Sequence, residues 1–218
     1  MMDIIWLSHI IDEQTPLYGG EQNIKIMSSK AIDSGDSCNT KFLSFPGHTG
    51  THVDVPNHFF QDGKKIEDYS PDQWIFSCPE IIKVDIQHGQ IISKEHLPEL
   101  SSNNNVDFVI FYTGFERFRN NNSYWESGPG LAPELANLMK TFFPNIRAVG
   151  MDFISISSLL FREQGRKAHH NFLGNDIVIF EDMKLSNIKD SIVKKIIALP
   201  LLYKNSDGAP CSILAWIH

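Results

Sequence analysis

Four side chains that can bind metal ions or carry protons lie within eleven residues of this 218-residue chain. They are His48, His52, Asp54 and His58, in the pattern His-x-x-x-His-x-Asp-x-x-x-His. Two imidazoles and a carboxylate form an N,N,O donor set that suits a divalent transition metal, most simply zinc. A lone histidine is more often a surface or core residue, but this spacing predicts a metal site formed by His48, His52 and Asp54.

The residues around this pattern favour an extended chain with a bend. Gly47, Gly50 and Pro56 disfavour a helix, and the β-branched residues between them favour a strand. In a strand the four chemical side chains share one face, because side chains alternate. A straight strand would separate His48 from His52 by about 13 Å, so Gly50 is expected to supply a bend or bulge. The segment therefore predicts a metal site on a kinked strand.

An open coordination position beside three protein ligands is typical of a catalytic metal, because that position holds water. The metal lowers the pKa of this water toward about 7, which makes hydroxide available at neutral pH. His58 follows the change of direction expected at Pro56, so we expect it to carry protons beside the metal. The alternative is that His58 only supports the site through a hydrogen bond.

His169 and Glu181 form a second candidate pair. Glu181 ends an apolar run at residues 177–180, and ligand sites of α/β folds tend to lie at such strand ends. If Asp54 and Glu181 bridge two ions, the site is dinuclear. Alternatively, His169 and its neighbour His170 are surface residues and Glu181 is an exposed acid. The chain contains no Gly-x-Ser-x-Gly nucleophile motif and no phosphate-binding glycine motif that would indicate a competing chemistry.

The composition is that of an ordinary globular protein, with 42% hydrophobic and 21% charged residues, and residues 1–218 are expected to form one domain. The net charge of −7 and the absence of basic runs argue against nucleic acid and anionic membrane as partners. No secretory signal or membrane span is expected, since basic N-terminal and long apolar segments are lacking. Three widely spaced cysteines suit a reduced cytoplasm.

The rest of the chain must supply the elements that position these residues. Apolar and alternating runs predict strands at residues 4–11, 23–29, 39–45, 80–86, 106–112, 147–152, 177–180, 192–203 and 211–217. Helical spacing predicts a helix at residues 132–142 and short helical pieces at 70–74, 93–97 and 169–174. Residues 162–167 are expected to form a polar loop and residues 205–210 a turn. This order favours a mixed sheet, α/β or α+β, over a Rossmann-type fold.

Residues 48–59 (HTGTHVDVPNHF) resemble the His-x-Gly-Thr-His-x-Asp-x-Pro-x-His signature of the metal-dependent cyclase family, which includes bacterial-type kynurenine formamidases and isatin hydrolases. The resemblance extends along nearly the whole chain. Five further segments match family motifs in order: residues 15–20, 62–66, 128–131, 148–152 and 207–210. The last of these, Asp-Gly-Ala-Pro, is similar to the C-terminal Asp-Gly-x-Pro of the family.

The resemblance implies a swivelling β/β/α domain of the α/β class, with a mixed β-sheet and flanking helices, that commonly forms dimers or tetramers. The metal ligands that it implies are His48, His52, Asp54, His169 and Glu181. Asp54 and Glu181 would bridge two ions in formamidase-like members, and His58 would be the catalytic acid–base residue. The implied cofactor is one or two zinc ions, with manganese as the alternative.

The implied activity is hydrolysis of the C–N amide bond of a small aromatic amide by metal-activated water. The best-known substrate is N-formylkynurenine, which belongs to tryptophan catabolism. One alternative is hydrolysis of another small cyclic or linear amide, such as isatin. Another is a protein that binds a metal or small ligand without turnover, but His58 argues against it, because a structural site is closed and needs no acid–base group.

Two departures from the family pattern affect the expected pocket. Residues 153–157 read Phe-Ile-Ser-Ile-Ser where the family often has Thr-Pro-Ser-hydrophobic-Asp, so Phe153, Ile154 and Ser157 differ. The early turn has Tyr18 followed by glycine where many formamidases carry Trp-Pro. Tyr18 is expected to stack on an aromatic substrate, the alternative being a packed turn residue.

Overall fold

The computed structural model describes residues 3–188 and 191–218. Nine strands in these residues form one sheet, in the order β5-β12-β13-β4-β11-β10-β8-β6, with β1 paired to β13 beside this path. The strands β11, β10, β8 and β6 are parallel neighbours, whereas β4, β13, β12, β5 and β1 pair antiparallel. The expected α/β class with a mixed sheet is confirmed.

The strands of the main sheet are β1 (Asp3–Trp6), β4 (His52–Asp54), β5 (Ile75–Phe76), β6 (Pro79–Lys83), β8 (Phe108–Tyr112), β10 (Ala148–Met151), β11 (Val178–Glu181), β12 (Val193–Pro200) and β13 (Gly208–Ile217). Two small sheets pair β2 (Lys25–Lys30) with β3 (Thr40–Ser44), and β7 (Ile91–Ile92) with β9 (Gly130–Leu131). The α-helices are α1 (Ser123–Glu126), α2 (Leu135–Phe142) and α3 (Arg162–Gly174). Short 3-10 turns are η1 (Ile32–Ser34), η2 (Pro56–His58), η3 (Ile66–Asp68), η4 (Pro71–Trp74), η5 (Lys94–His96), η6 (Phe115–Phe118) and η7 (Leu159–Phe161).

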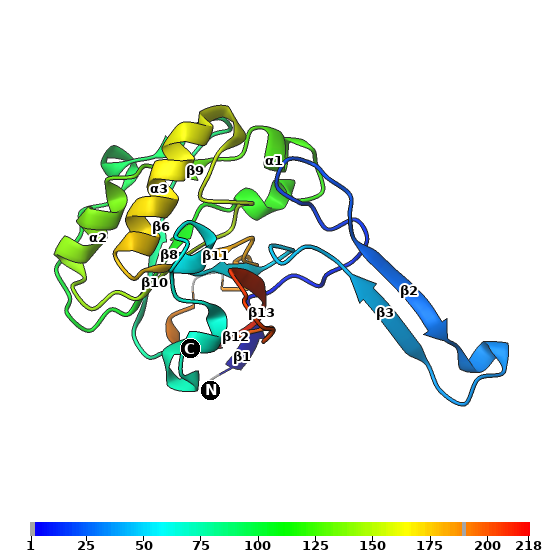
Figure 1. The fold of residues 1–218 in the computed structure, drawn as a ribbon. Helices are drawn as coiled ribbons and strands as arrows, with labels where there is room; N and C mark the ends of the chain where they lie inside the picture. The colour runs from blue at the N-terminus through cyan, green and yellow to red at the C-terminus, as the bar shows by residue number, and fades with distance from the viewer. Residues whose placement is uncertain (1–2, 189–190) are drawn as a thin grey trace.

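The parallel strands are apolar on both faces, because both faces are covered. On β8, Val109 and Phe111 face one apolar cluster and Phe108 and Ile110 face the other, as strand alternation requires. The first cluster is covered by the helices α2 and α3 (Figure 1). The second is closed by side chains of β12 and β13, so the sheet curls over its own antiparallel half. The site strands β4 and β11 lie at the centre of this curled sheet.

The prediction of a polar loop at residues 162–167 is wrong. Helix α3 runs continuously from Arg162 to Gly174 and includes the short helical piece expected at residues 169–174. Its buried residues include Gly165, Ala168 and His169, so much of the buried face is small or polar rather than large and apolar. An added Cβ at Gly165 would lie 2.0 Å from the Ser157 hydroxyl, so glycine permits this close approach. An apolar pattern could not reveal such a helix.

The segment from His48 to His58 is also not one kinked strand. Only His52–Asp54 pairs as strand β4, while His48 lies in the bend before it and His58 lies on η2. The bend expected at Gly50 is present, with a left-handed φ of +61°. Pairing stops after Asp54 because Pro56 begins the 3-10 turn η2.

Several other elements differ from the expectation in their bounds or in their type. Strand β13 begins at Gly208, inside the expected turn, because residues 208–210 pair with β4. Strands β1 and β12 end at Trp6 and Pro200, earlier than expected, and α2 begins at Leu135 rather than at residue 132. The expected helix at residues 93–97 is the 3-10 turn η5.

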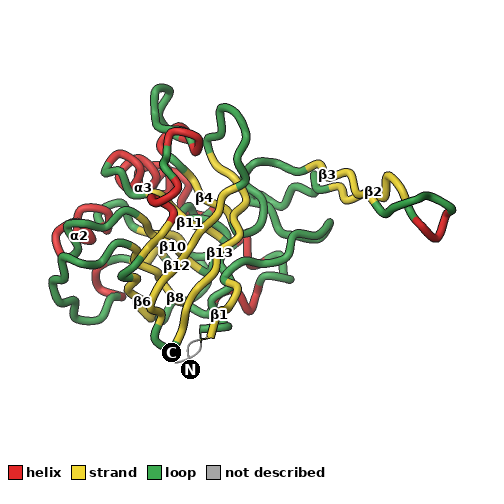
Figure 2. The backbone as a smooth tube through the Cα atoms, turned by 90° about the horizontal axis from the view of Figure 1, so that it is seen from below, coloured by secondary structure: helices red, strands yellow, loops and turns green. Residues whose placement is uncertain are grey.

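The hairpin formed by β2 and β3 projects from the body of the molecule as an arm (Figures 1 and 2). Every residue of β3 is exposed, including Phe42 and Leu43, and Met27 of β2 is exposed as well. The register pairs Met27 with Phe42 and Ile26 with Leu43, so apolar side chains occupy both faces of the arm. A two-stranded hairpin alone is only marginally stable, so this arm is a candidate contact surface.

Within the described residues, no helix has the length and apolar character needed to cross a membrane. The three cysteines, Cys38, Cys78 and Cys211, are free.

Candidate active site

The pairing of three strands brings His52, Asp54 and Glu181 together. Strand β4 lies between β11 and β13, and Glu181 of β11 is directly opposite His52. Directly paired residues of adjacent strands share a face, so the His52 and Glu181 side chains meet. The intervening Val53 points the other way into the apolar core, where it is fully buried.

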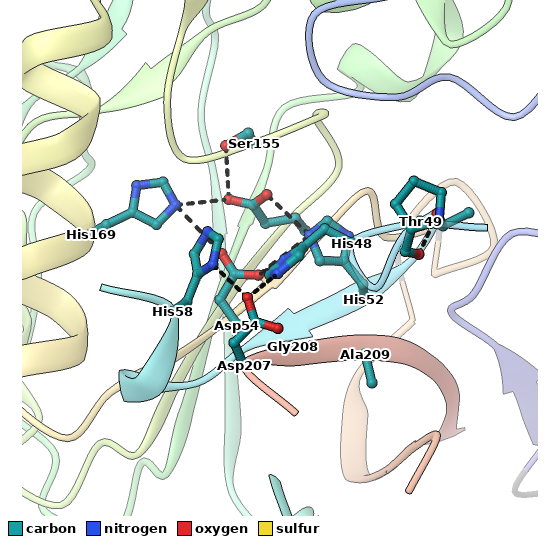
Figure 3. Close-up of polar contacts among 12 residues, drawn as sticks. His48, Thr49, His52, Asp54, His58, Ser155, His169, Asp207, Gly208 and Ala209 are labelled. Atoms are coloured by element: carbon teal, nitrogen blue, oxygen red, sulfur yellow. Dashed lines mark hydrogen bonds and ion pairs between the residues drawn. The ribbon is translucent and has the colours of Figure 1, made fainter. Parts of the chain in front are cut away.

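Helix α3 adds His169 to these three residues (Figure 3). His169 Nε2 lies 3.4 Å from Asp54 Oδ2 and 3.7 Å from Glu181 Oε1. His52 Nε2 lies 3.4 Å from both Asp54 Oδ1 and Glu181 Oε2. Two imidazole nitrogens thus alternate with two carboxylates, and all four residues are buried.

The other ring nitrogens determine which atoms of these histidines face the carboxylates. His52 Nδ1–H donates to the Gly50 carbonyl at 2.8 Å, and His169 Nδ1–H donates to the Gly165 carbonyl at 2.9 Å. In the neutral ring each Nε2 is then an acceptor that faces acceptor oxygens, an arrangement typical of metal-ligating histidines. Separations near 3.4 Å equal the ligand–ligand edges of a tetrahedral ion with bonds of about 2.1 Å. The donor set therefore fits a divalent cation.

His48 and His58 extend the cluster on the side of Asp54. His48 Nδ1 lies 2.7 Å from Asp54 Oδ1, and the His48 and His58 ring centroids are 4.1 Å apart. Asp207 Oδ2 lies 3.0 Å from both His48 Nε2 and His58 Nδ1. Among the described residues, donor atoms close enough to share an ion occur in two groups: His48, Asp54 and His58, and His52, Asp54 and Glu181. Asp54 is common to both groups.

The carboxylates raise the pKa values of the buried histidines. Burial alone would lower the pKa of His169, but hydrogen bonds and charge from Asp54 and Glu181 raise it to about 9. The pKa of His48 is likewise raised to about 9, because Asp54 and Asp207 outweigh burial. Burial would raise the pKa of Asp54, but His48 and the other imidazoles hold it well below its usual range. The carboxylates therefore favour positive charge at the position of these imidazoles.

The end of β11 is held in place by groups outside the cluster. Glu181 Oε1 accepts hydrogen bonds from Ser155 Oγ at 3.0 Å and from the Ile156 amide at 2.6 Å. The next residue, Asp182, has a left-handed φ of +49°, and Arg119 donates to both of its carboxylate oxygens at 2.7–3.1 Å. The ion pair fixes the bend that directs the Glu181 carboxylate into the cluster.

The cluster opens into a pocket of about 320 Å³. The half-buried Tyr18 lines this pocket, and Phe59 stacks on His169 with ring centroids 4.4 Å apart. The remaining lining residues outside the cluster are Pro16, Gly50, Ile154, Ser155, Ser157, Arg162 and Arg166. Of the three family departures, Ile154 and Ser157 line the pocket and Phe153 is buried in the core. The residues predicted to bind metal, to carry protons or to contact the substrate all line this one pocket: Tyr18, His48, His52, Asp54, His58, His169 and Glu181.

Sequence reasoning missed two features of the site. Asp207 belongs to a recognised motif, but nothing in the sequence indicated that it links His48 to His58 across about 150 residues of chain. Arg162 and Arg166 were missed because their segment was expected to be a loop. The spacing of Arg162, Arg166 and His169 is helical, and this signal could have revealed them.

Known proteins that resemble this chain in sequence include members of one family of hydrolases. Residues 5–158 match the family model described as "Putative cyclase". A kynurenine formamidase of Geobacillus thermodenitrificans is 27% identical over 204 residues, which cover 94% of this chain and 92% of the relative. A kynurenine formamidase of Bacillus anthracis is 30% identical over 180 residues, covering 82% and 80%.

Solved structures share the whole fold. An isatin hydrolase bound to the product analogue thioisatinate aligns with a TM-score of 0.81 at 15% identity, covering 99% of this chain and 92% of the other. Isatin hydrolase A from Labrenzia aggregata aligns with a TM-score of 0.78 at 20% identity, covering 99% and 94%. The fold and the sequence match define the class, and the chain belongs to the cyclase family.

Proposed function

We propose that this protein is a metal-dependent amidohydrolase that cleaves the C–N bond of a small aromatic amide, with N-formylkynurenine as the preferred candidate. The observation that carries the proposal is the buried convergence of two histidine Nε2 atoms and two carboxylates at an open pocket. The names of the relatives, kynurenine formamidase and isatin hydrolase, support the choice of an amide.

One or two zinc ions, with manganese as the alternative, are the proposed cofactor. The proposed ligands are His48, His52, Asp54, His169 and Glu181. Asp54 belongs to both groups of convergent donors, so it is the proposed bridge when two ions bind. A bound divalent ion would supply Lewis acidity: it polarises the carbonyl and lowers the pKa of water.

The proposed role of His58 is proton transfer. It takes a proton from the attacking water and returns it to the leaving amine nitrogen when the C–N bond breaks. Its Nδ1–H donates to Asp207, and this hydrogen bond leaves Nε2 free to exchange the proton. Tyr18 and Phe59 provide aromatic surfaces on which a substrate ring can pack.

We also propose that residues 1–218 act as one domain, in the cytoplasm, and assemble as a homo-oligomer of two or four chains. Three free cysteines support a reducing compartment. The exposed apolar side chains of the arm support self-association.

Hydrolysis of N-formylkynurenine by the purified protein, before and after chelation and after zinc return, tests the proposal. Turnover that is lost on chelation and restored by zinc is the expected result. Turnover of isatin but not of N-formylkynurenine would replace the preferred substrate with a cyclic amide. A zinc-loaded protein that hydrolyses no formyl or cyclic amide would contradict the proposal and favour a binding protein.

A further inference from the structure

Helix α3 presents two arginines to the pocket from the same face as His169. Arg162, Arg166 and His169 are spaced i, i+4 and i+7, and positions with this spacing lie on one face of a helix. His169 on this face reaches Asp54, and both arginines line the pocket. With a rise of about 1.5 Å per residue, Arg166 lies roughly 4–5 Å and Arg162 roughly 10–11 Å along the helix from His169.

Among the residues that the structure describes, neither guanidinium has a carboxylate partner, although Arg162 makes a side-chain hydrogen bond with Tyr18. The ion pairs within residues 3–188 and 191–218 that involve α3 are those of His169 and the pair Lys167–Glu163, and they include neither Arg162 nor Arg166. Both side chains are exposed, at the pocket rather than in the core. The whole chain has a net charge of −7, so these two positive side chains at the pocket have a charge opposite to that of the molecule as a whole. They offer an anionic group two positively charged partners at this pocket.

The substrate-facing surface is therefore divided into two parts. Tyr18, Phe59 and Ile154 supply an aromatic and aliphatic wall, and the arginines, of which Arg162 hydrogen-bonds to Tyr18, supply positive charge beside it. A guanidinium binds a carboxylate through two parallel hydrogen bonds, which gives direction as well as attraction. An aryl amide with a carboxylate on a short side chain matches this division.

We propose that Arg162 and Arg166 bind a carboxylate of the substrate, and that the enzyme thereby selects aromatic amides that carry a carboxylate over analogues that lack one. The proposal rests on the proposed amidohydrolase function and specifies its substrate class. The carboxylate lies one to two helical turns, roughly 5–10 Å, from the amide that is cleaved beside His169. The arginines bind and orient; they take no part in the proton transfers.

Two probes that differ only in the carboxylate test the proposal: N-formylkynurenine and its decarboxylated analogue N-formylkynuramine. The variants Arg162→Gln and Arg166→Gln and their combination are compared with Lys167→Gln in the zinc-loaded full chain. Lys167 is on the same helix and its loss removes the same charge, but it does not line the pocket. We expect each arginine variant to lower kcat/KM for N-formylkynurenine roughly 10- to 100-fold, mainly through KM. Activity on N-formylkynuramine, and the Lys167→Gln activities, should stay at wild-type values.

Equal losses on both probes, or equal use of the two probes by the wild type, would overturn the arginine assignment and leave the hydrolase function standing. Binding provides the same test without turnover. Titration calorimetry should show that kynurenine binds the zinc-loaded wild type more tightly than kynuramine, and that Arg166→Gln removes the difference. Equal affinities in the wild type would reject the subsite even if hydrolysis fails.

Discussion

His58 lies where a histidine can either bind an ion or exchange a proton. It groups with His48 and Asp54 as a potential ligand, and its Nδ1 is held by Asp207. A histidine whose other nitrogen is fixed by a carboxylate suits both roles, so only a measurement separates them.

We expect His58→Ala to retain bound zinc and to lower kcat by about 10²- to 10⁴-fold, the usual contribution of general acid–base catalysis. Zinc content by elemental analysis and turnover of N-formylkynurenine are the measurements. His170→Ala is the control, because His170 is an exposed histidine of α3 that does not line the pocket. Loss of zinc from His58→Ala would show that His58 is a ligand.

Asp207 is expected to position the imidazoles of His48 and His58. Asp207→Asn keeps an oxygen that can accept from one imidazole but loses the charge that holds both His48 and His58. At saturating zinc we expect kcat to fall about 10- to 100-fold, typical for groups that support a metal site, with KM unchanged. Asp62→Asn, in an exposed turn, is the control. A change confined to KM would instead place Asp207 against the substrate.

At the scale of elements, the position of α3 decides whether His169 reaches the carboxylates. Gly165 lies one turn before His169, accepts its Nδ1–H, and packs against Ser157 with no room for a Cβ. The distance between His169 and the carboxylates therefore depends on the close packing that glycine allows at position 165.

We expect Gly165→Ala to destabilise the protein by about 1–3 kcal/mol through overpacking and to weaken zinc binding, because α3 must move away from Ser157. Urea unfolding and zinc titration measure the two effects. Gly174→Ala is the matched control, since its Cβ would meet only the end of the Phe60 ring, at 3.3 Å. Unchanged zinc affinity in a destabilised Gly165→Ala would mean that the two properties are not coupled.

Strand β10 ends at a buried carboxyl group whose ionisation opposes folding. Asp152 Oδ1 accepts from Thr113, but Oδ2 has no hydrogen-bond partner among the described residues. Burial raises the pKa of Asp152 from 3.8 to about 6, although the Thr113 hydrogen bonds oppose this. The folded state therefore binds this proton more tightly than the unfolded state. The stabilisation is fully present below pH 4 and is lost as the pH rises through 6.

Asp152→Asn removes this titration and keeps the acceptor for Thr113. Relative to the wild type, we expect the variant to gain roughly 2.4 kcal/mol in the free energy of unfolding between pH 4 and pH 7. Urea unfolding at several pH values measures the difference, and Asp62→Asn is the control. A difference between variant and wild type that does not change with pH would contradict the prediction.

At the scale of the whole molecule, the arm leaves apolar side chains exposed on both of its faces. Phe42 is 55% exposed and Leu43 is 53% exposed, and they lie on opposite faces of the hairpin. The arm joins the site directly, since β3 ends four residues before His48. Self-association through the arm would therefore also stabilise the start of the metal-binding segment.

We expect the double variant Phe42→Ser, Leu43→Ser to shift the protein toward the monomer, because apolar contact area is lost at the proposed interface. Light scattering coupled to size-exclusion chromatography measures the mass. Lys41→Ser, an exposed polar position on the same strand, should leave the mass unchanged. A wild-type protein that is monomeric at all concentrations would remove the basis of this prediction.

Much of the fold followed from local patterns. The interior strand at residues 108–112 and the strand before Glu181 were predictable because continuous apolar runs require burial on both faces. The first half of helix α3, residues 162–168, was not, because the residues that it buries there are Gly165 and Ala168. The start of β13 was not, because Gly208 and Pro210 signal a turn locally and are extended only by pairing with β4.

The sequence by itself determined the donor types, the bend at Gly50 and the class of chemistry, since these depend on residues close together in the chain. Only the tertiary structure decided that Glu181 is opposite His52, that His169 faces both carboxylates, and that Asp207 joins His48 to His58. These contacts arise from strand register and helix docking, which are set by packing over the whole chain. Local spacing contains no information about such distances.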